Sequence, residues 1–216
     1  MMPPMGPGAE HTPTAIDLLG LVLGSSFAAG INLYATVLVV GLVQVAGWAT
    51  LPAGLAILAS PVVLAVAAVL FLVEFLADKI PFVDSLWDAA HTVVRPVAAA
   101  AIGFGALSQA PDGWRVGAAL LAGTVALTSH GAKASTRAAV NTSPEPFSNV
   151  ALSLAEDVLA ATLTWLAVTH PVLATVVVGA LLAGALLLIR VIVRLARRWL
   201  VNPVLDARDK PRSPSS

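Results

Sequence analysis

Long apolar runs follow one another along almost the whole chain. Six segments of about 20 or more mostly apolar residues are separated by short polar turns, and about 20 such residues are enough to cross a bilayer. Only 11% of the 216 residues are charged, whereas a soluble domain carries about a quarter. Too little polar surface remains to cover a globule in water. The sequence therefore predicts an all-α, polytopic transmembrane helical bundle with six spans.

The predicted spans and domains follow from where the apolar runs begin and end. The spans are expected at residues 17–47, 55–77, 84–108, 114–140, from Pro146 to His170, and from Pro171 to about Leu200. Disordered tails are expected at 1–16 and 201–216, and two three-helix halves at 17–108 and 109–200. Ser60-Pro61 precedes Glu74 by the same distance as Ser143-Pro144 precedes Asp157. This spacing is compatible with two inverted three-helix repeats, an arrangement found in many transporter folds.

Basic residues predict how the bundle sits in the membrane. With six spans both termini share one side, and that side holds every Lys and Arg except Arg115. Because basic residues gather on the cytoplasmic side, both termini are expected in the cytoplasm. The protein is then a multi-pass component of the inner (cytoplasmic) membrane. The helically spaced basic run that starts at Arg190 and Arg194 is expected to anchor at anionic headgroups.

Charged residues also interrupt the apolar segments, where lipid makes them costly. Asp84, Asp88, His91 and Arg95 are spaced four, three and four apart, which places them on one helical face. Two further stripes share this pattern, one from His130 through Lys133 and Arg137 to Asn141, the other from Asn149 through Ser153 to Glu156 or Asp157. A charge at the bilayer centre costs about 2.5–3.5 kcal/mol on insertion scales. The stripes are therefore expected to face inward, with Lys133 and Arg137 approaching the acids.

These residues define a candidate polar cavity for an ion or small polar solute. The candidate site comprises Glu74, Asp78, Asp84, Asp88, His91, Lys133, Arg137, Glu156 and Asp157. His91 and His130 are candidates for a proton relay, because imidazole titrates near neutrality. Asp84, Asp88 and His91 have a spacing that could share a cation. Nearby Lys79 and Arg95 already supply counter-charge, so no metal and no cofactor is expected.

Several functional classes remain open. The leading hypothesis is a small transporter or channel-like protein, whose partners are the bilayer, an ion or small polar solute and another copy of itself, with no nucleic acid. The alternatives are an intramembrane lipid-modifying enzyme that uses His91 or His130, and a scaffold or assembly factor whose ion pairs are purely structural. Hydrolase, nucleotide-binding and dinucleotide motifs are absent, and so is cysteine, which makes an enzyme the less favoured reading.

Two long strings resemble a known family. They are EFLADKIPFVDSLWDAAHTVVRP at 74–96 and HGAKASTRAAVNTSPEPFSNVALSLAEDV at 130–158, and the shorter GINLYATV at 30–37 is similar to the same family's first helix. The family is a group of bacterial membrane proteins known as domain-of-unknown-function family 4126, and the resemblance covers about residues 17–200. It implies a multi-spanning membrane protein in which these polar hairpins are characteristic. It carries no substrate, reaction or catalytic residue.

Overall fold

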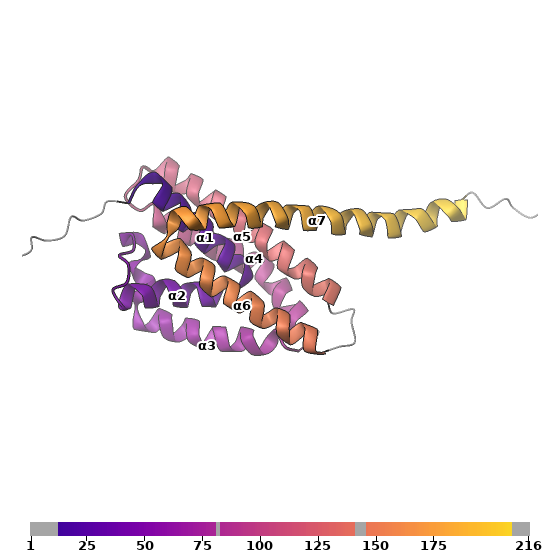
Figure 1. Ribbon diagram of the computed structural model, residues 1–216, viewed down its shortest axis with the longest axis horizontal. Coiled ribbons are helices and arrows are strands. Elements are labelled where there is room, and N and C mark those ends of the chain that lie inside the picture. Colours follow the sequence, from indigo (N-terminus) through magenta and orange to yellow (C-terminus); the bar gives the residue numbers. More distant parts are fainter. Residues whose placement is uncertain (1–12, 81–82, 141–145, 209–216) are drawn as a thin grey trace, which may run out of the picture.

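All regular structure in the described part of the chain is helical. The computed structural model describes residues 13–80, 83–140 and 146–208 (Figure 1). The helices are α1 (Ala15–Ile31), α2 (Leu33–Val45), the 3₁₀ helix η1 (Ala53–Ala59), α3 (Pro61–Ala77), α4 (Val83–Ala106), α5 (Asp112–Val140), α6 (Pro146–Thr169) and α7 (Pro171–Arg208). The predicted all-α fold is confirmed.

The first apolar run is broken near its middle. Asn32 has extended backbone angles, with φ −144° and ψ 103°, so it ends α1 and begins α2. Its side-chain oxygen accepts a hydrogen bond from the Ala35 amide at 2.9 Å, which caps the new helix. The span expected over 17–47 is thus divided into two helices at Asn32, because Asn32 satisfies the backbone better as a cap than as an interior helical residue.

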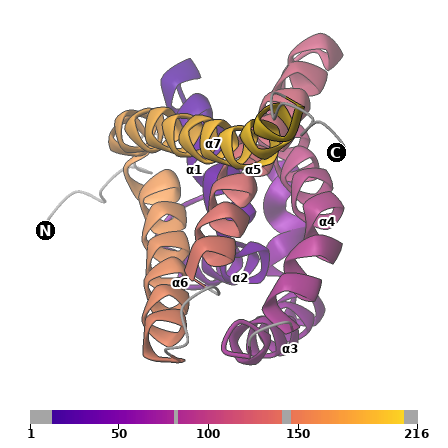
Figure 2. The ribbon, with the colours of Figure 1, turned by 90° about the vertical axis from the view of Figure 1, so that its right-hand side faces the viewer.

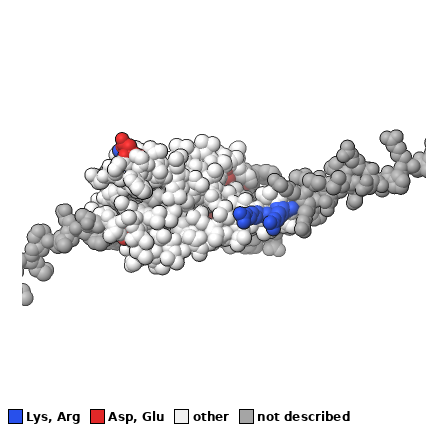
Figure 3. Space-filling view, turned by 90° about the horizontal axis from the view of Figure 1, so that it is seen from above, with Lys and Arg blue, Asp and Glu red and all other residues white. Residues whose placement is uncertain are grey.

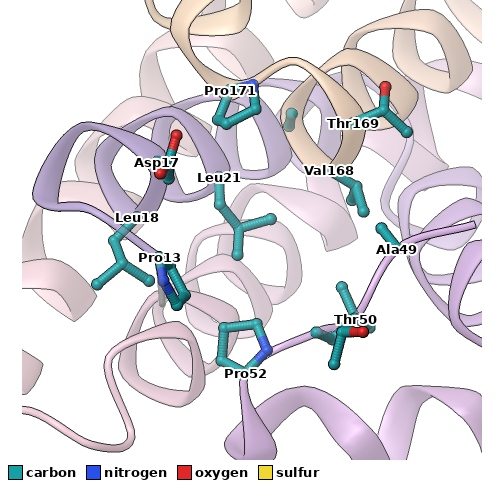
Figure 4. A pocket seen from close by; sticks show the side chains of 12 residues that line it. Pro13, Asp17, Leu18, Leu21, Ala49, Thr50, Pro52, Val168, Thr169 and Pro171 are labelled. Carbon is teal, nitrogen blue, oxygen red and sulfur yellow. The ribbon is translucent and has the colours of Figure 1, made fainter. Parts of the chain in front are cut away.

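The two helices double back as a hairpin. Leu21 of α1 and Val40 of α2 pack in the same apolar cluster as Leu51, which follows α2. Asp17, near the start of α1, and Thr50, after the end of α2, line one pocket together with Pro171 (Figure 4). Helices α1 and α2 thus enter and leave at one end of the bundle, here called the Pro171 end, and Asn32 forms the tip between them.

The remaining helices give a lower span count than expected. Three helices are long and apolar enough to cross a membrane: α4, α6 from Phe147, and α7 as far as Leu195. A fourth span results if η1 and α3, bent by 63° relative to each other, count as one. Six spans are not confirmed. The inverted repeat is not confirmed either, because a broken hairpin opens the first half and the continuous helix α5 opens the second.

Helix α1 lies at the centre of the bundle. It contacts α4, α5, α6 and α7, and every residue but Leu23 between Gly20 and Ile31 is buried. A side chain at Gly30 would collide with the Ser129 side chain and the Ala126 backbone, so glycine permits the close approach of α1 to α5. Seen from one end, α7 crosses over one side of the bundle while α3 and α6 stand at its periphery (Figure 2).

The outer surface is suited to lipid. Val69 of α3, Leu86 of α4 and Val176 of α7 are more than half exposed, and few charged side chains are visible on the face in Figure 3. Arg190 and Arg194 of α7 are exposed and follow Ile189, which lies beside Gly131 of α5. We call this end of the bundle, opposite the Pro171 end, the Arg190 end. Helix α7 continues to Arg208, into the segment predicted as a tail. The described chain thus begins at the Pro171 end, and α7 leaves the bundle at the Arg190 end.

The hairpin predicts a labelling pattern that one continuous span does not. The chain has no cysteine, so single substitutions carry no background. Ala15→Cys and Thr50→Cys, both exposed at the Pro171 end, are expected to react with a membrane-impermeant maleimide from the same side. Arg194→Cys serves as the control and should react from the other side. Opposite accessibility at positions 15 and 50 would contradict the hairpin.

Candidate functional site

Helices α3, α4, α5 and α6 bring their charged residues into one buried group. We call it the charged cluster; it comprises Glu74, Asp78, Asp84, Asp88, Arg95, Lys133, Arg137, Glu156 and Asp157. All of these are less than a tenth exposed except Asp157, which is half-buried. The three-and-four spacing explains the convergence, since it places the polar residues of α4 and of α5 on one face of each helix. Asn141, in the predicted α5 stripe, lies outside the described residues.

One part of the cluster is organised by Arg95. Its Nη2 lies 2.5 Å from Glu74 Oε1, and its Nη1 lies 3.3 Å from Asp88 Oδ1. The same Nη1 donates to the Gly30 carbonyl at 3.2 Å. Arg95 was expected on the polar face of its helix but not in the candidate site. Its contacts connect α3, α4 and the tip of the α1–α2 hairpin.

A second part is organised by Arg137. Its Nε and Nη2 both donate to Glu156 Oε2, at 3.1 and 2.5 Å. Nη2 also lies 3.0 Å from Asp78 Oδ2, Nη1 donates to the Asp78 carbonyl at 2.8 Å, and Asp84 Oδ2 is 3.6 Å from Nη1. Lys133 joins the two parts, with its Nζ 3.2 Å from Asp78 Oδ2 and 3.6 Å from Glu74 Oε1. The expectation that Lys133 and Arg137 approach the acids is confirmed.

The hairpin tip lies against this cluster. Gly30 and Ile31 carbonyls at the end of α1 accept hydrogen bonds from Arg95 and Lys133. The last carbonyls of a helix lack intrahelical partners and carry partial negative charge, so cations satisfy them well. On the other side of the tip, Asn32 Nδ2 donates to Asp157 Oδ1 at 2.8 Å. Sequence reasoning missed this role of Asn32, although a Gly and an Asn two residues apart in an apolar run are a signal for a helix break.

Both ring nitrogens of the two candidate relay histidines, His91 and His130, take part in hydrogen bonds. His130 Nδ1 lies 2.6 Å from Arg95 Nη1, which can only donate, so this nitrogen accepts and Nε2–H donates to Thr92 Oγ1 at 3.1 Å. His91 Nδ1 donates to the Trp87 carbonyl at 2.8 Å, and its Nε2 shares a hydrogen bond of 3.0 Å with the Tyr34 hydroxyl. In this arrangement His130 is neutral, and it must lose its Arg95 contact before it can take up a proton.

The cluster holds more acid than base. Six carboxylates face three fixed cations, because Lys79 donates instead to the Phe75 carbonyl. Four buried carboxylate oxygens also lack a hydrogen-bond donor among the described residues: Glu74 Oε2, Asp78 Oδ1, Asp88 Oδ1 and Asp157 Oδ2. Leaving a buried acceptor unfilled costs about 1–3 kcal/mol, and more for a charged group. Protons, water or a bound cation are the chemical species that can fill these positions.

Polar groups continue along the inner face of α6 on both sides of the cluster. Towards the Arg190 end, Asn149 and Ser153 are buried and their side chains have no hydrogen-bond partner among the described residues. Towards the Pro171 end, Thr164 lies with its Oγ1 3.4 Å from Thr36 Oγ1. One turn beyond, Val168 lines the pocket of about 420 Å³ that Figure 4 shows. The inner face of α6 therefore carries polar residues on both sides of the cluster, separated by the buried apolar residues Ala160, Leu163 and Ala167.

The residues whose spacing could share a metal point to different partners. Asp84 lies beside Arg137, Asp88 beside Arg95, and His91 bonds to Tyr34. Within 13–80, 83–140 and 146–195, no group of three or more His, Asp or Glu side chains is arranged to hold a metal ion.

The buried arginines predict a large stability difference. Arg137→Met leaves Asp78, Asp84 and Glu156 without their shared cation, so we expect a loss of about 3–5 kcal/mol in unfolding free energy. Arg115→Met is the matched control. Arg115 pairs with an exposed Asp112, and such surface pairs contribute about 0–1 kcal/mol. Unfolding in detergent micelles measures both, and equal losses would contradict the cluster.

Comparison with known proteins identifies the family. A family model described as "Domain of unknown function (DUF4126)" matches residues 19–192. Neither a curated protein nor a solved structure matches the chain. The matched range contains the α1–α2 hairpin from Leu19 onward and all nine residues of the charged cluster. The chain therefore belongs to the DUF4126 family.

Proposed function

We propose that this membrane protein is a small transporter or channel-like protein, and that its charged cluster binds a cation or small polar solute during passage. The observation that carries the proposal is the contact between a buried charged cluster and the tip of a broken helical hairpin. Many transporters bind their substrates near the membrane midplane at helices interrupted in this way, where backbone carbonyls and helix ends become available.

The charge balance favours a cation, and a proton is included in this class. Three more carboxylates than fixed cations surround the site, and buried acceptor oxygens remain open. Such a site attracts positive charge and repels anions. The route we propose follows the inner face of α6, from the pocket at the Pro171 end past Thr164 and the cluster to Ser153 and Asn149.

The orientation we propose places the Arg190 end in the cytoplasm. Lys133 contacts the hairpin tip and Asp78, which precedes Lys79, and these residues lie away from the Pro171 end, as does Arg190. Arg115, by contrast, follows Trp114, which lines a pocket with Ala15 near the Pro171 end. Besides the four candidate spans, we count α5 as a crossing, because its 29 residues pack along α4. The chain would then cross the inner membrane five times, with α3 to α7, and α1–α2 would enter from the opposite face without crossing. The first described residues are outside the cytoplasm in this arrangement, which revises the orientation expected from the sequence.

The alternative classes draw less support from the contacts. An intramembrane enzyme would need His91 or His130 free to exchange a proton with substrate, yet both ring nitrogens of each are hydrogen bonded. A scaffold would need no polar route beyond the ion pairs. The side chains of Asn149 and Ser153 have no hydrogen-bond partner among the residues that the structure describes, which favours a route that admits water or a solute.

Flux through the purified protein tests the proposal. In proteoliposomes, over a panel of monovalent cations, protons and small polar solutes, we expect flux to fall about tenfold or more in Glu156→Gln and in Asp157→Asn. One lost charge-assisted contact is worth about 1.5–3 kcal/mol, and about 1.4 kcal/mol is tenfold. Asp112→Asn, an exposed acid outside the cluster, should leave flux unchanged. Absence of flux in the panel, or flux indifferent to both cluster variants, counts against transport.

The route along α6 makes a separate prediction. Ser153→Cys and Thr164→Cys should react with small cationic methanethiosulfonates, because thiols ionise and react where water reaches them. Val158→Cys, on the outward apolar face of the same helix, is the control and should react far more slowly. Equally slow reaction at all three positions would contradict a route along α6, but it would not contradict transport itself.

A further inference from the structure

The ammonium group of Lys133 occupies the centre of the charged cluster. Its side chain is 2% exposed, and Nζ donates to the Ile31 carbonyl at 3.0 Å and to Asp78 Oδ2 at 3.2 Å. Three further carboxylate oxygens surround Nζ: Glu74 Oε1 at 3.6 Å, Glu156 Oε2 at 3.6 Å and Asp88 Oδ1 at 4.0 Å. Four carboxylates and one backbone carbonyl thus surround Nζ, and the same carboxylate oxygens also pair with Arg95 or Arg137.

This shell has the composition of a cation site. Hard cations in proteins are held by carboxylate and carbonyl oxygens, and broken helices supply such carbonyls in transporters. The acids of the shell also have unused capacity, because the second oxygens of Glu74 and Asp78 have no donor within the described part of the chain and both residues are fully buried. Oxygens 3.0–4.0 Å from Nζ match an ammonium-sized ion better than a divalent ion, which needs about 2.0–2.6 Å.

We propose that the space around Lys133 Nζ is a monovalent-cation site, which the Lys133 ammonium fills in this conformation as a tethered competitor of the permeating cation. The inference rests on the proposed transport function for its role. The site itself can be tested without flux. Withdrawal of the flexible lysine stem leaves four carboxylates around an empty cation position, and a free monovalent cation restores the charge balance.

Replacement of Lys133 removes the tethered ammonium, so that binding of a free cation can be measured through the melting temperature. Purified Lys133→Ala in detergent is heated in chloride salts of N-methyl-D-glucamine, potassium or ammonium at equal ionic strength. We expect a saturable rise in melting temperature of about 5–10 °C with potassium or ammonium at a hundredfold excess over the dissociation constant. Wild-type protein and Lys79→Ala, which removes a lysine outside the shell, should show no such rise. The same melting temperature in all three salts, or a rise shared by the controls, overturns the proposal.

A charge-balanced variant covers the case in which Lys133→Ala is recovered only unfolded. Lys133→Met combined with Asp78→Asn removes one acid together with the cation, so it should fold in N-methyl-D-glucamine and lose the salt response. Failure of this variant to fold in every salt overturns the cation site. A rise in melting temperature with potassium or ammonium but no flux would support the cation site and contradict transport. Flux without such a rise would support transport and contradict the cation site at Lys133.

Discussion

Burial of charge inside an apolar bundle is the constraint on which the rest of this structure depends. An uncompensated charge at membrane depth is costly, so Arg95, Lys133 and Arg137 can be buried only where acids meet them. The acids come from α3, α4 and α6, and their side chains therefore converge on the cations of α4 and α5. The cations also satisfy the carbonyls of Gly30 and Ile31, without which a helix could not end in the bundle interior. The charged cluster and the hairpin tip thus stabilise each other.

Much of the cluster follows from local periodicity. The spacing of Asp84, Asp88 and His91 predicts that they share one face of a helix, and in the structure that face is buried. The start of α7 follows equally directly, because Pro171 cannot continue the preceding helix and fits a helix start. Local spacing cannot say which acid meets which cation. That Arg95 pairs with Glu74 and Arg137 with Glu156 depends on how separate helices pack.

The α1–α2 hairpin could not be predicted from residue spacing and composition, for two physical reasons. The run from Asp17 to Gly47 is apolar throughout, so its composition is the same whether it crosses the membrane or returns. No Lys or Arg precedes Lys79, so the distribution of basic residues does not indicate on which side of the membrane the first apolar segment begins or ends. The break itself had a local signal in Asn32, whose short polar side chain caps a helix more readily than it continues one.

Asp157 differs from the other five acids in a way that bears on mechanism. Each of the others lies within 4.0 Å of an Arg or Lys nitrogen, whereas the described contact of Asp157 is the neutral amide of Asn32. A change of charge at Asp157 therefore breaks no described ion pair, and its first effect falls on the residue that separates α1 from α2. The network thus fixes five acids firmly and leaves the sixth coupled to the hairpin tip. A cation arriving at Asp157 would act on the one polar break in the central apolar hairpin, while Lys133 holds the rest of the cluster together.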